Sequence, residues 1–338
     1  MLAVSVYGWM RSEAQKIKSE KISPTMKVPE VSVVMSVFNG AAALPATLES
    51  ILRQKDCAFE FIVVNDGSTD DSGIVLDQWA QRDGRFRVIH QANAGLTRAL
   101  IRGCSDARGA FIARQDCGDV SHPDRLRKQL ERLRADLTVV AASCHTQFVG
   151  PKDEPLYVSE ISEAQLNTTL ARGINGTYLG PSHHGSVMMR RATYFAVGGY
   201  RAAFYFAQDL DLWTRVAEAG QFAVVSEVLY EASLDPGSIS GTQIAEQRAL
   251  ANLISLATQA RRSGKTENGF LMEAALIRSV GNAERSKRIA MGNYFIGSCL
   301  RQSNPRGAAA YFRQALRDDP WLWRARLRWL QAALTTCQ

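Results

Sequence analysis

Short apolar runs alternate with helical patterns through the first half of the chain. Residues 31–38 are almost wholly apolar and β-branched, which is typical of a strand buried on both faces of a parallel sheet. Similar runs at 59–64, 85–90 and 110–114 predict three further strands. The alternation indicates βαβ units, so we predict an α/β fold with a mostly parallel, Rossmann-type sheet flanked by helices. The intervening helical patterns cover 44–52, 74–79 and 97–107.

Beyond residue 119 the alternation loosens, and from about residue 242 only helical patterns remain. We therefore predict an exposed leader over 1–29, an α/β domain over 30–241 and an all-helical C-terminal module over 242–338. The predicted elements after residue 119 are helices at 126–133 and 209–219, extended segments at 139–142 and 185–190, and tail helices at 243–262, 267–280, 286–301, 306–317 and 321–335.

One part of the tail, near 290–320, has the spacing of a tetratricopeptide-like helix pair. Ala308, Phe312, Ala315 and Pro320 match the second helix of such a repeat, and Gly297 lies one residue from the glycine position of the first helix. Only one unit is visible, whereas a repeat stack needs about three units to be stable alone. We expect a helix pair packed on the main domain, with a peptide-binding surface as the alternative.

Composition and cysteine usage indicate an ordinary globular protein of a reducing compartment. Hydrophobic residues make up 46% of the 338 residues, which suffices for a substantial core. The six cysteines are scattered without a CxxC pair, which favours reduced thiols and a cytoplasmic location. No apolar stretch approaches the roughly 18 residues of a membrane span, and the N-terminus lacks a signal-peptide pattern.

The net charge of +7 comes partly from arginines in the predicted C-terminal helices. A solvated helix face is one interpretation of these arginines, and attraction to anionic lipid or another polyanion is the other. We therefore expect a cytoplasmic protein, with peripheral contact at the inner face of the membrane as the open alternative, and no nucleic-acid partner. The arginines concerned are Arg313, Arg317, Arg324, Arg326 and Arg328.

Two acids, Asp116 and Asp119, follow the apolar run that ends near residue 114. Open α/β sheets bind ligands at the carboxyl ends of their strands, and paired carboxylates there can hold a divalent cation with substrate phosphates. The chain has neither GxGxxG nor GxxxxGK[ST], so a metal or side chains must hold any phosphate. The alternative is an acidic turn that caps the helix beginning near Pro123.

An ordered series of motifs resembles glycosyltransferase family 2, the inverting, nucleotide-sugar-dependent enzymes with a GT-A fold. The resemblance covers roughly residues 30–240, and the ordered set is far more specific than any single motif. It implies a GT-A-like domain and leaves the leader and the helical tail outside. The motifs are VSVVMSVFNG at 31–40, FIVVNDGSTD at 61–70, NAGL at 93–96, DCGDVSHPDRL at 116–126, HGSVMMRR at 184–191, QDLDLW at 208–213 and PGSIS at 236–240.

The resemblance implies roles for four residues in binding the nucleotide. Ser36 and Phe38 would line the base pocket, and Phe38 offers a flat apolar face. Asp66 would accept a charge-assisted hydrogen bond from the nucleobase ring N–H. Its alternative role is that of a turn residue that binds local backbone N–H groups. Asp116 would reach the ribose hydroxyls.

The resemblance also implies which residues serve the transfer step. Asp209 would act as the general base that takes the proton of the acceptor hydroxyl, although its position at a helix start also suits a cap. His184 would contact the diphosphate or the acceptor, with a hydrogen-bonded structural imidazole as the alternative. We expect Asp211 to be structural and Trp213 to lie in the core. The neighbouring His183 receives no role.

The metal position departs from the family pattern. The family commonly reads Asp-x-Asp-Asp and binds metal through the third residue, where this chain has Gly118. Asp119 would then hold a divalent cation, Mn²⁺ or Mg²⁺; the alternative is weak or absent metal binding with a basic side chain on the diphosphate. Gln208 and Asp235 are further departures, since the family often has Glu and His there.

The resemblance implies transfer of a sugar, with inversion, from a nucleotide-sugar to a hydroxyl acceptor of glycan or lipid-linked glycan type. A UDP-sugar is the default donor. Cell-surface polysaccharide or glycoconjugate synthesis is the expected setting. The departures at Gly118, Gln208 and Asp235 leave a non-catalytic nucleotide-sugar-binding protein as the alternative, and a helical interaction module with a relict α/β domain as a third.

Overall fold

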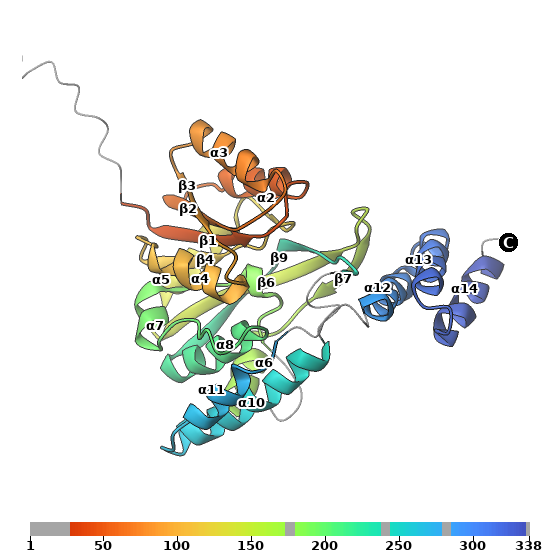
Figure 1. Ribbon diagram of the computed structural model, residues 1–338. Helices are drawn as coiled ribbons and strands as arrows, with labels where there is room; N and C mark the ends of the chain where they lie inside the picture. Colours follow the sequence, from red (N-terminus) through yellow and green to blue (C-terminus); the bar gives the residue numbers. More distant parts are fainter. Residues whose placement is uncertain (1–27, 173–179, 238–243, 279–284, 336–338) are drawn as a thin grey trace, which may run out of the picture.

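The computed structural model describes residues 28–172, 180–237, 244–278 and 285–335 (Figure 1). The leader predicted over 1–29 lies almost entirely outside the described residues. Within them, one sheet has the strand order β3-β2-β1-β4-β8-β6-β9-β5, with β7 paired to β6. The strands are β1 (Val31–Val37), β2 (Phe59–Asp66), β3 (Phe86–Gln91), β4 (Phe111–Arg114), β5 (Val120–Ser121), β6 (Val139–Val149), β7 (Pro155–Ser159), β8 (Met188–Arg190) and β9 (Gln221–Ser233).

Most residue pairs of the sheet are parallel, which confirms the predicted fold class. Strands β3, β2, β1 and β4 form a parallel half, and β6 pairs in parallel with β9 over a long register. Strand β8 joins the two parts through antiparallel pairs with β4 and β6. Every residue of β2 is buried, as expected for a strand covered on both faces.

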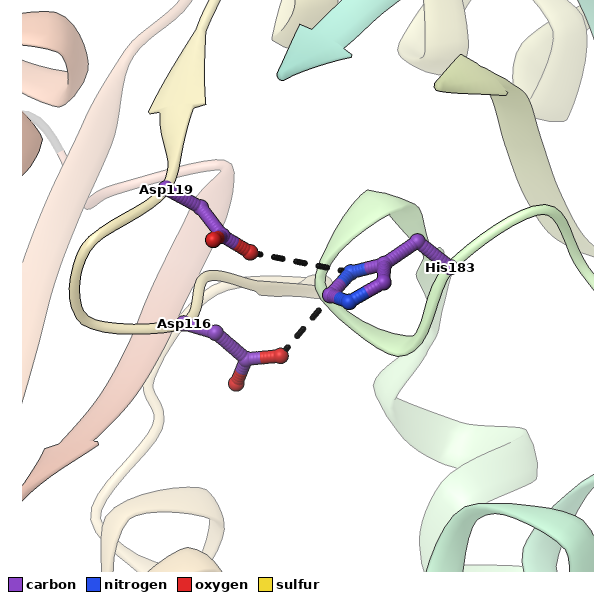
Figure 2. A group of neighbouring side chains, drawn as sticks. All are labelled: Asp116, Asp119 and His183. Atoms are coloured by element: carbon purple, nitrogen blue, oxygen red, sulfur yellow. Dashed lines mark ion pairs between the residues drawn. The ribbon is translucent and has the colours of Figure 1, made fainter. Parts of the chain in front are cut away.

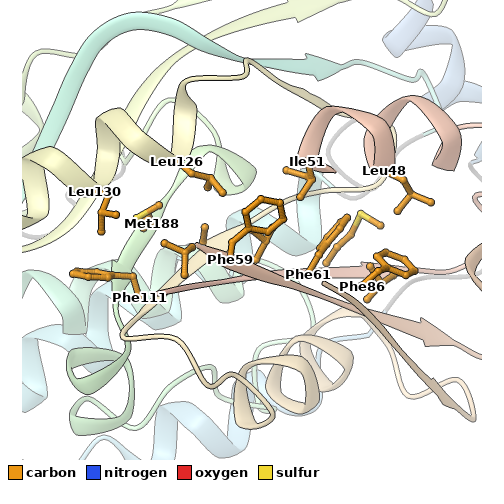
Figure 3. Packing of buried hydrophobic residues seen from close by; sticks show 14 of the residues in the cluster. Leu48, Ile51, Phe59, Phe61, Phe86, Phe111, Leu126, Leu130 and Met188 are labelled. Carbon is orange, nitrogen blue, oxygen red and sulfur yellow. The ribbon is translucent and has the colours of Figure 1, made fainter. Parts of the chain in front are cut away.

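Three helices cover one face of the sheet. Alternate residues of β1, including Val33 and Met35, point to this face and pack with Leu48 of the first helix and Leu126 and Leu130 of the third. Figure 3 shows part of this apolar cluster between strands and helices. The helices are α2 (Leu44–Leu52), α3 (Ser72–Arg82) and α5 (Arg125–Ala135).

Four helices cover the opposite face. Val34 of β1 points to this side and lies in a second cluster with Leu100, Leu212 and Trp213. The complete burial of Trp213 confirms that it belongs to the core. The sheet is therefore the middle layer of three. The helices are α4 (Leu96–Ser105), α6 (Glu163–Arg172), α7 (Arg191–Ala196) and α8 (Gln208–Ala219).

The tail is helical throughout its described residues. Its first two helices pack on the α/β body, since Leu250 and Ile254 share a cluster with Phe204, Phe206 and Leu210. The last three form their own clusters and reach the sheet at β7. The division at 241/242 stays a prediction. The helices are α10 (Ile244–Arg262), α11 (Asn268–Ala274), α12 (Arg285–Leu300), α13 (Pro305–Asp318) and α14 (Trp323–Thr335).

Packing between α12 and α13 agrees with the helix-pair pattern. Ala308, Phe312 and Ala315 are fully buried, and Gly297 lies where an added Cβ would stand 2.9 Å from the Phe312 ring. The tetratricopeptide resemblance itself stays a prediction, because close packing of two helices is common to many folds.

The sequence did not reveal three strands, β5, β7 and β9. Strand β9 is thirteen residues long, but Ser226, Glu227 and Val228 are exposed in succession and break any alternating pattern. The register with β6 shifts at the same place, between Cys144 and His145, so a bulge hides the strand signal. Strand β6 is also longer than predicted, extending to Val149.

Candidate functional site

The carboxyl ends of β1, β2 and β4 meet at one edge of the sheet. The parallel register pairs Val37 with Asn65 and Val34 with Arg114, so Phe38, Asp66 and Asp116 all lie at that edge. This is also where the strand order reverses from β1 to β4, the usual position of a ligand crevice in open α/β sheets.

The loops after β1 and β2 are bonded to each other. The Asn39 side-chain oxygen accepts from the Thr69 N–H at 2.8 Å, and the Asp70 carboxylate accepts from the Ala41 N–H at 3.0 Å. These bonds fix the backbone around Phe38, whose ring is 53% exposed and free to contact a ligand. Ser36, near the end of β1, is half-buried.

Asp66 is almost fully buried and organises the segment that leads into α4. Its Oδ1 accepts from the Gln91 amide at 2.7 Å and the Ala94 N–H at 2.9 Å, and its Oδ2 accepts from the Gly95 N–H at 2.8 Å. Gly95 has a φ of +87°, which favours glycine. Asp66 therefore binds backbone N–H groups of a neighbouring turn, as its alternative role predicts. Its contact with a nucleobase stays a prediction.

Three side chains come together after β4. Asp116, Asp119 and His183 offer ligand atoms that all lie within 4.8 Å of one another (Figure 2). The His183 Nδ1 lies 3.7 Å from Asp119 Oδ2 and 4.0 Å from Asp116 Oδ2. His183 was missed in the sequence because its partners are more than sixty positions away, and spacing reveals only local ligand pairs.

The electrostatics of this cluster favour a bound cation. Burial, with the neighbouring Asp116 carboxylate, raises the pKa of Asp119 well above its usual value. Burial also opposes ionisation of Asp116, but the Arg114 guanidinium holds its pKa below the ordinary range. Burial lowers the pKa of His183, so the imidazole is neutral. Its Nδ1 accepts from the Gly185 N–H at 3.1 Å, and a cation bound to Nδ1 would replace that contact. Carboxylate oxygens and an imidazole nitrogen are a donor set that fits a divalent cation such as Mn²⁺ or Mg²⁺.

Strand β9 donates hydrogen bonds to the loop that carries Asp116 and Asp119. The Tyr230 hydroxyl donates to Asp119 Oδ2 at 2.8 Å, and the Ser233 N–H donates to Asp119 Oδ1 at 2.9 Å. The Tyr230 ring also stacks on His183, with centroids 5.4 Å apart. Gly185 permits this packing, since a Cβ there would stand 1.9 Å from the Tyr230 hydroxyl oxygen.

His184 faces a different set of partners. Its Nε2 lies 2.6 Å from the Tyr200 hydroxyl and 3.4 Å from Arg114 Nε. Burial and the adjacent Arg114 charge lower the pKa of His184 to about 3, so the ring is neutral. Arg114 in turn donates to Asp116 Oδ1 at 2.6 Å. His184 is thus linked to the acid loop through Arg114, in agreement with the structural alternative, and its contact with a donor or acceptor stays a prediction.

Asp209 and Asp211 lie in the first turn of α8. Asp211 is buried and bonded to two guanidiniums, those of Arg201 and Arg215, which explains its structural role. Asp209 is partly exposed. Its charge is one of several smaller contributions, after burial, that raise the pKa of Tyr200 well above its usual value. Asp209 is therefore in the electrostatic neighbourhood of the Tyr200–His184 pair.

Gly118 leaves space at the position where the family carries its metal-binding acid. Its φ is +98°, and an added Cβ would meet only the Ala43 Cβ, at 3.8 Å. Its N–H donates to the Thr47 hydroxyl at 3.0 Å. A side chain here would meet little steric resistance but would strain the backbone.

These features define an α/β protein with an acidic, cation-compatible edge at the topological switch point. The sequence model of glycosyl transferase family 2 matches residues 32–195. EpsE of Bacillus subtilis (strain 168), described as a glycosyltransferase, is 34% identical over 57% of this chain and 68% of its own length. The chain belongs to glycosyltransferase family 2 and is a glycosyltransferase enzyme.

Other relatives match this chain over only a small part of their own length. The hyaluronan synthase of Pasteurella multocida is 25% identical over 66% of this chain, which spans only 22% of that enzyme. The chain likewise spans about a third of EpsH and EpsJ of Bacillus subtilis, 36% and 33% of their lengths.

Solved structures share the fold. The mannosyltransferase PcManGT of Pyrobaculum calidifontis, in complex with GDP-Man and Mn²⁺, has a TM-score of 0.53 and 17% identity over 97% of this chain and 93% of its own. Residues 1–349 of TarS from S. aureus, in complex with UDP-GlcNAc, have a TM-score of 0.50 and 14% identity over 90% and 89%. In the described part of this chain, no helix has the length and apolar character needed to cross a bilayer.

Proposed function

We propose that this enzyme transfers a sugar, with inversion, from a nucleotide-sugar to a hydroxyl of a glycan or lipid-linked glycan. The observation that carries the proposal is the cluster of Asp116, Asp119 and His183 at the carboxyl edge of β4. In a family 2 glycosyltransferase, acids at this edge face the phosphates of the donor. The GDP-Man and UDP-GlcNAc complexes of the structural neighbours support a nucleotide-sugar donor.

The donor would lie across the ends of β1, β2 and β4. Ser36 and Phe38 line the base pocket, and the exposed Phe38 ring offers a flat surface for stacking. Asp66 accepts from a nucleobase ring N–H with its less occupied oxygen, Oδ2. Asp116, which is partly exposed, reaches the ribose. A UDP-sugar is the default donor.

Asp119 and His183 would hold a divalent cation, Mn²⁺ or Mg²⁺, with Asp116 beside them. When bound, the cation supplies positive charge to the donor diphosphate. His183 thus compensates for the ligand that Gly118 lacks. The neutral imidazole and the crowding of two carboxylates support this assignment. His184 would act indirectly: it accepts from Arg114 and so orients the guanidinium that donates to Asp116.

Asp209 would be the general base. Inverting transfer is one displacement at the anomeric carbon: the acceptor oxygen forms the new bond as the bond to the nucleoside diphosphate breaks, and the acceptor proton passes to the base. A carboxylate in the first turn of α8, partly exposed and beside the Tyr200–His184 pair, suits this role. A positioned base is typically worth roughly 10²–10⁴ in rate.

The acceptor belongs to cell-surface polysaccharide or glycoconjugate synthesis in this proposal. The relationship to a hyaluronan synthase supports a polysaccharide product. A lipid-linked glycan would place the acceptor at a membrane surface, so peripheral contact with the membrane is part of the same proposal.

Donor hydrolysis tests the assignment. The wild-type protein should slowly release nucleoside diphosphate from its correct donor, and Asp209→Asn should reduce this release by at least about 100-fold without loss of donor binding. Asp56→Asn is the matched control, because Asp56 is exposed and lies before β2, at the opposite edge of the sheet. Full turnover by Asp209→Asn would overturn the base assignment. Donor binding by the wild type with no release would favour the non-catalytic alternative.

A further inference from the structure

The last helix carries an apolar stripe that faces away from the protein. Trp323, Leu327 and Leu330 stand at positions i, i+4 and i+7 of α14, so they share one face of the helix. Their exposed fractions are 65%, 48% and 49%. Trp321, just before the helix, is 90% exposed. Isolated exposed apolar residues are ordinary, but three on one helix face, with an exposed tryptophan just before the helix, call for an explanation.

The fold does not require this stripe. The opposite face of α14 packs against α13 and α12 through Ala325, Trp329 and Ala332. The helix is therefore held by this face, and α14 lies at the end of the α12–α14 series farthest from the sheet (Figure 1).

Positive charge flanks the stripe. Arg324 and Arg326 are exposed on either side of it, and within the described part of the chain neither guanidinium is paired with a carboxylate. Arg324 lies over the Trp323 ring, 5.6 Å from its centroid. The surrounding sequence is strongly basic, with seven arginines and two aspartates between residues 301 and 332.

We propose that this face of α14 docks the enzyme on an anionic membrane surface. Tryptophan favours the boundary between headgroups and acyl chains, and arginine pairs with anionic headgroups. An apolar face together with a basic flank provides the two signals that stable peripheral binding needs. Among the described residues, no helix is long and apolar enough to cross a bilayer.

The inference rests on the proposed function, which includes peripheral contact with the membrane, and adds the surface that makes this contact. Vesicle binding can be measured without any sugar transfer, so a failure of the docking surface and a failure of the proposed reaction are distinguishable. The full chain is mixed with vesicles of phosphatidylcholine alone, or of phosphatidylcholine and phosphatidylglycerol, and the bound fraction is measured by flotation. We expect binding to the anionic vesicles, at least about tenfold weaker binding to the neutral ones, and a steep decline with added salt.

Two variants and their matched controls locate the surface. Trp321→Ser/Trp323→Ser/Leu327→Ser should reduce vesicle binding by at least about tenfold, since each side chain loses apolar contact. Its control, Leu137→Ser/Met272→Ser/Leu276→Ser, removes three other exposed apolar side chains and should bind as wild type. Arg324→Glu/Arg326→Glu should lose binding to anionic vesicles, whereas Arg172→Glu/Arg248→Glu, with the same charge change at exposed positions elsewhere, should not.

Donor hydrolysis and thermal unfolding of all four variants report on the fold and should match the wild type. Equal loss of binding in a variant and its control would overturn the proposal, because net charge or bulk hydrophobicity would then explain it. A concentration-dependent dimer that Trp323→Ser abolishes, without vesicle binding by the wild type, would assign the face to a second copy of the chain instead.

Discussion

The Tyr230 hydroxyl lies between the two acids of the β4 loop and bonds to both. It donates to Asp119 Oδ2 at 2.8 Å and accepts from the Asp116 backbone N–H at 3.1 Å. One buried oxygen thus sets the separation of two residues that would face the donor. The strand that carries Tyr230 has no recognisable signal in the sequence, so a central part of the site was invisible there.

We therefore expect Tyr230→Phe to damage the loop more than its loss of one oxygen suggests. The substitution leaves a buried N–H and a carboxylate oxygen without this partner, which costs about 1–3 kcal/mol of unfolding free energy. Urea denaturation measures that loss, and donor affinity should fall with it. Tyr311→Phe is the control: its hydroxyl bonds to Glu154 at 3.0 Å, away from the acids, so donor affinity should be unchanged. Wild-type donor affinity in Tyr230→Phe would contradict the positioning role.

His183 and His184 should separate into a ligand and a structural residue. His183→Ala should weaken Mn²⁺ binding in the presence of nucleoside diphosphate by at least about tenfold, the lower end of what loss of a supporting partner costs. His184→Ala should instead reduce unfolding free energy by about 1–3 kcal/mol, because Tyr200 and Arg114 lose a buried partner. Calorimetry and urea denaturation distinguish the two effects. His122→Ala, at an exposed histidine, should change neither; the reverse pattern would exchange the two roles.

Cation binding should strengthen as pH rises. The pKa of Asp119 is raised by burial and by Asp116, so the cation-free fold holds a proton more tightly than the unfolded chain does. This contribution to stability is present at low pH and is lost as pH rises through the raised pKa. A cation replaces that proton, so the thermal stabilisation by Mn²⁺ should grow over the same interval. Asp119→Asn should remove the pH dependence, and an unchanged profile in that variant would place the cation elsewhere.

Restoring an acid at residue 118 should tighten the cation site at some cost in stability. Gly118→Asp places a carboxylate into open space, but its φ of +98° makes any side chain costly, by about 1–3 kcal/mol. Gly118→Asn has the same shape and strain without the charge. We expect stronger Mn²⁺ binding by calorimetry for the Asp variant than for the Asn variant. Equal affinities would show that residue 118 does not face the cation.

Three strands of the parallel half of the sheet were predictable because each contains an apolar run. Strands β1, β2 and β4 are buried on both faces, so their sequences carry no competing polar pattern. The tail helices α10 and α13 were equally clear from helical periodicity. The bulged β9 was not, because three consecutive residues leave the alternating pattern.

The acids were also predictable, since Asp66 is the last residue of buried β2 and Asp116 lies two residues after buried β4. Which histidine faces them was not. His183 and His184 are adjacent in sequence, yet a short 3₁₀ turn at His184–Ser186 directs one toward Asp119 and the other toward Tyr200. The two side chains point in different directions because they are neighbours on a turn. Which of them faces Asp119 depends on contacts with residues far away in the sequence.

The bonds from β9 to the acid loop also govern when the site can form. Tyr230 and Ser233 lie 111 and 114 positions after Asp119. Forming these contacts brings together two distant parts of the chain, which costs chain entropy. During synthesis, a ribosome must pass residue 233 before Asp119 can acquire its partners, although β1, β2 and β4 are complete more than a hundred residues earlier. The contacts that hold Asp119 are therefore among the last of the α/β body to become available as the chain is made. Because contacts between residues far apart in sequence form slowly, we expect the acid loop to become ordered later than the neighbouring strands.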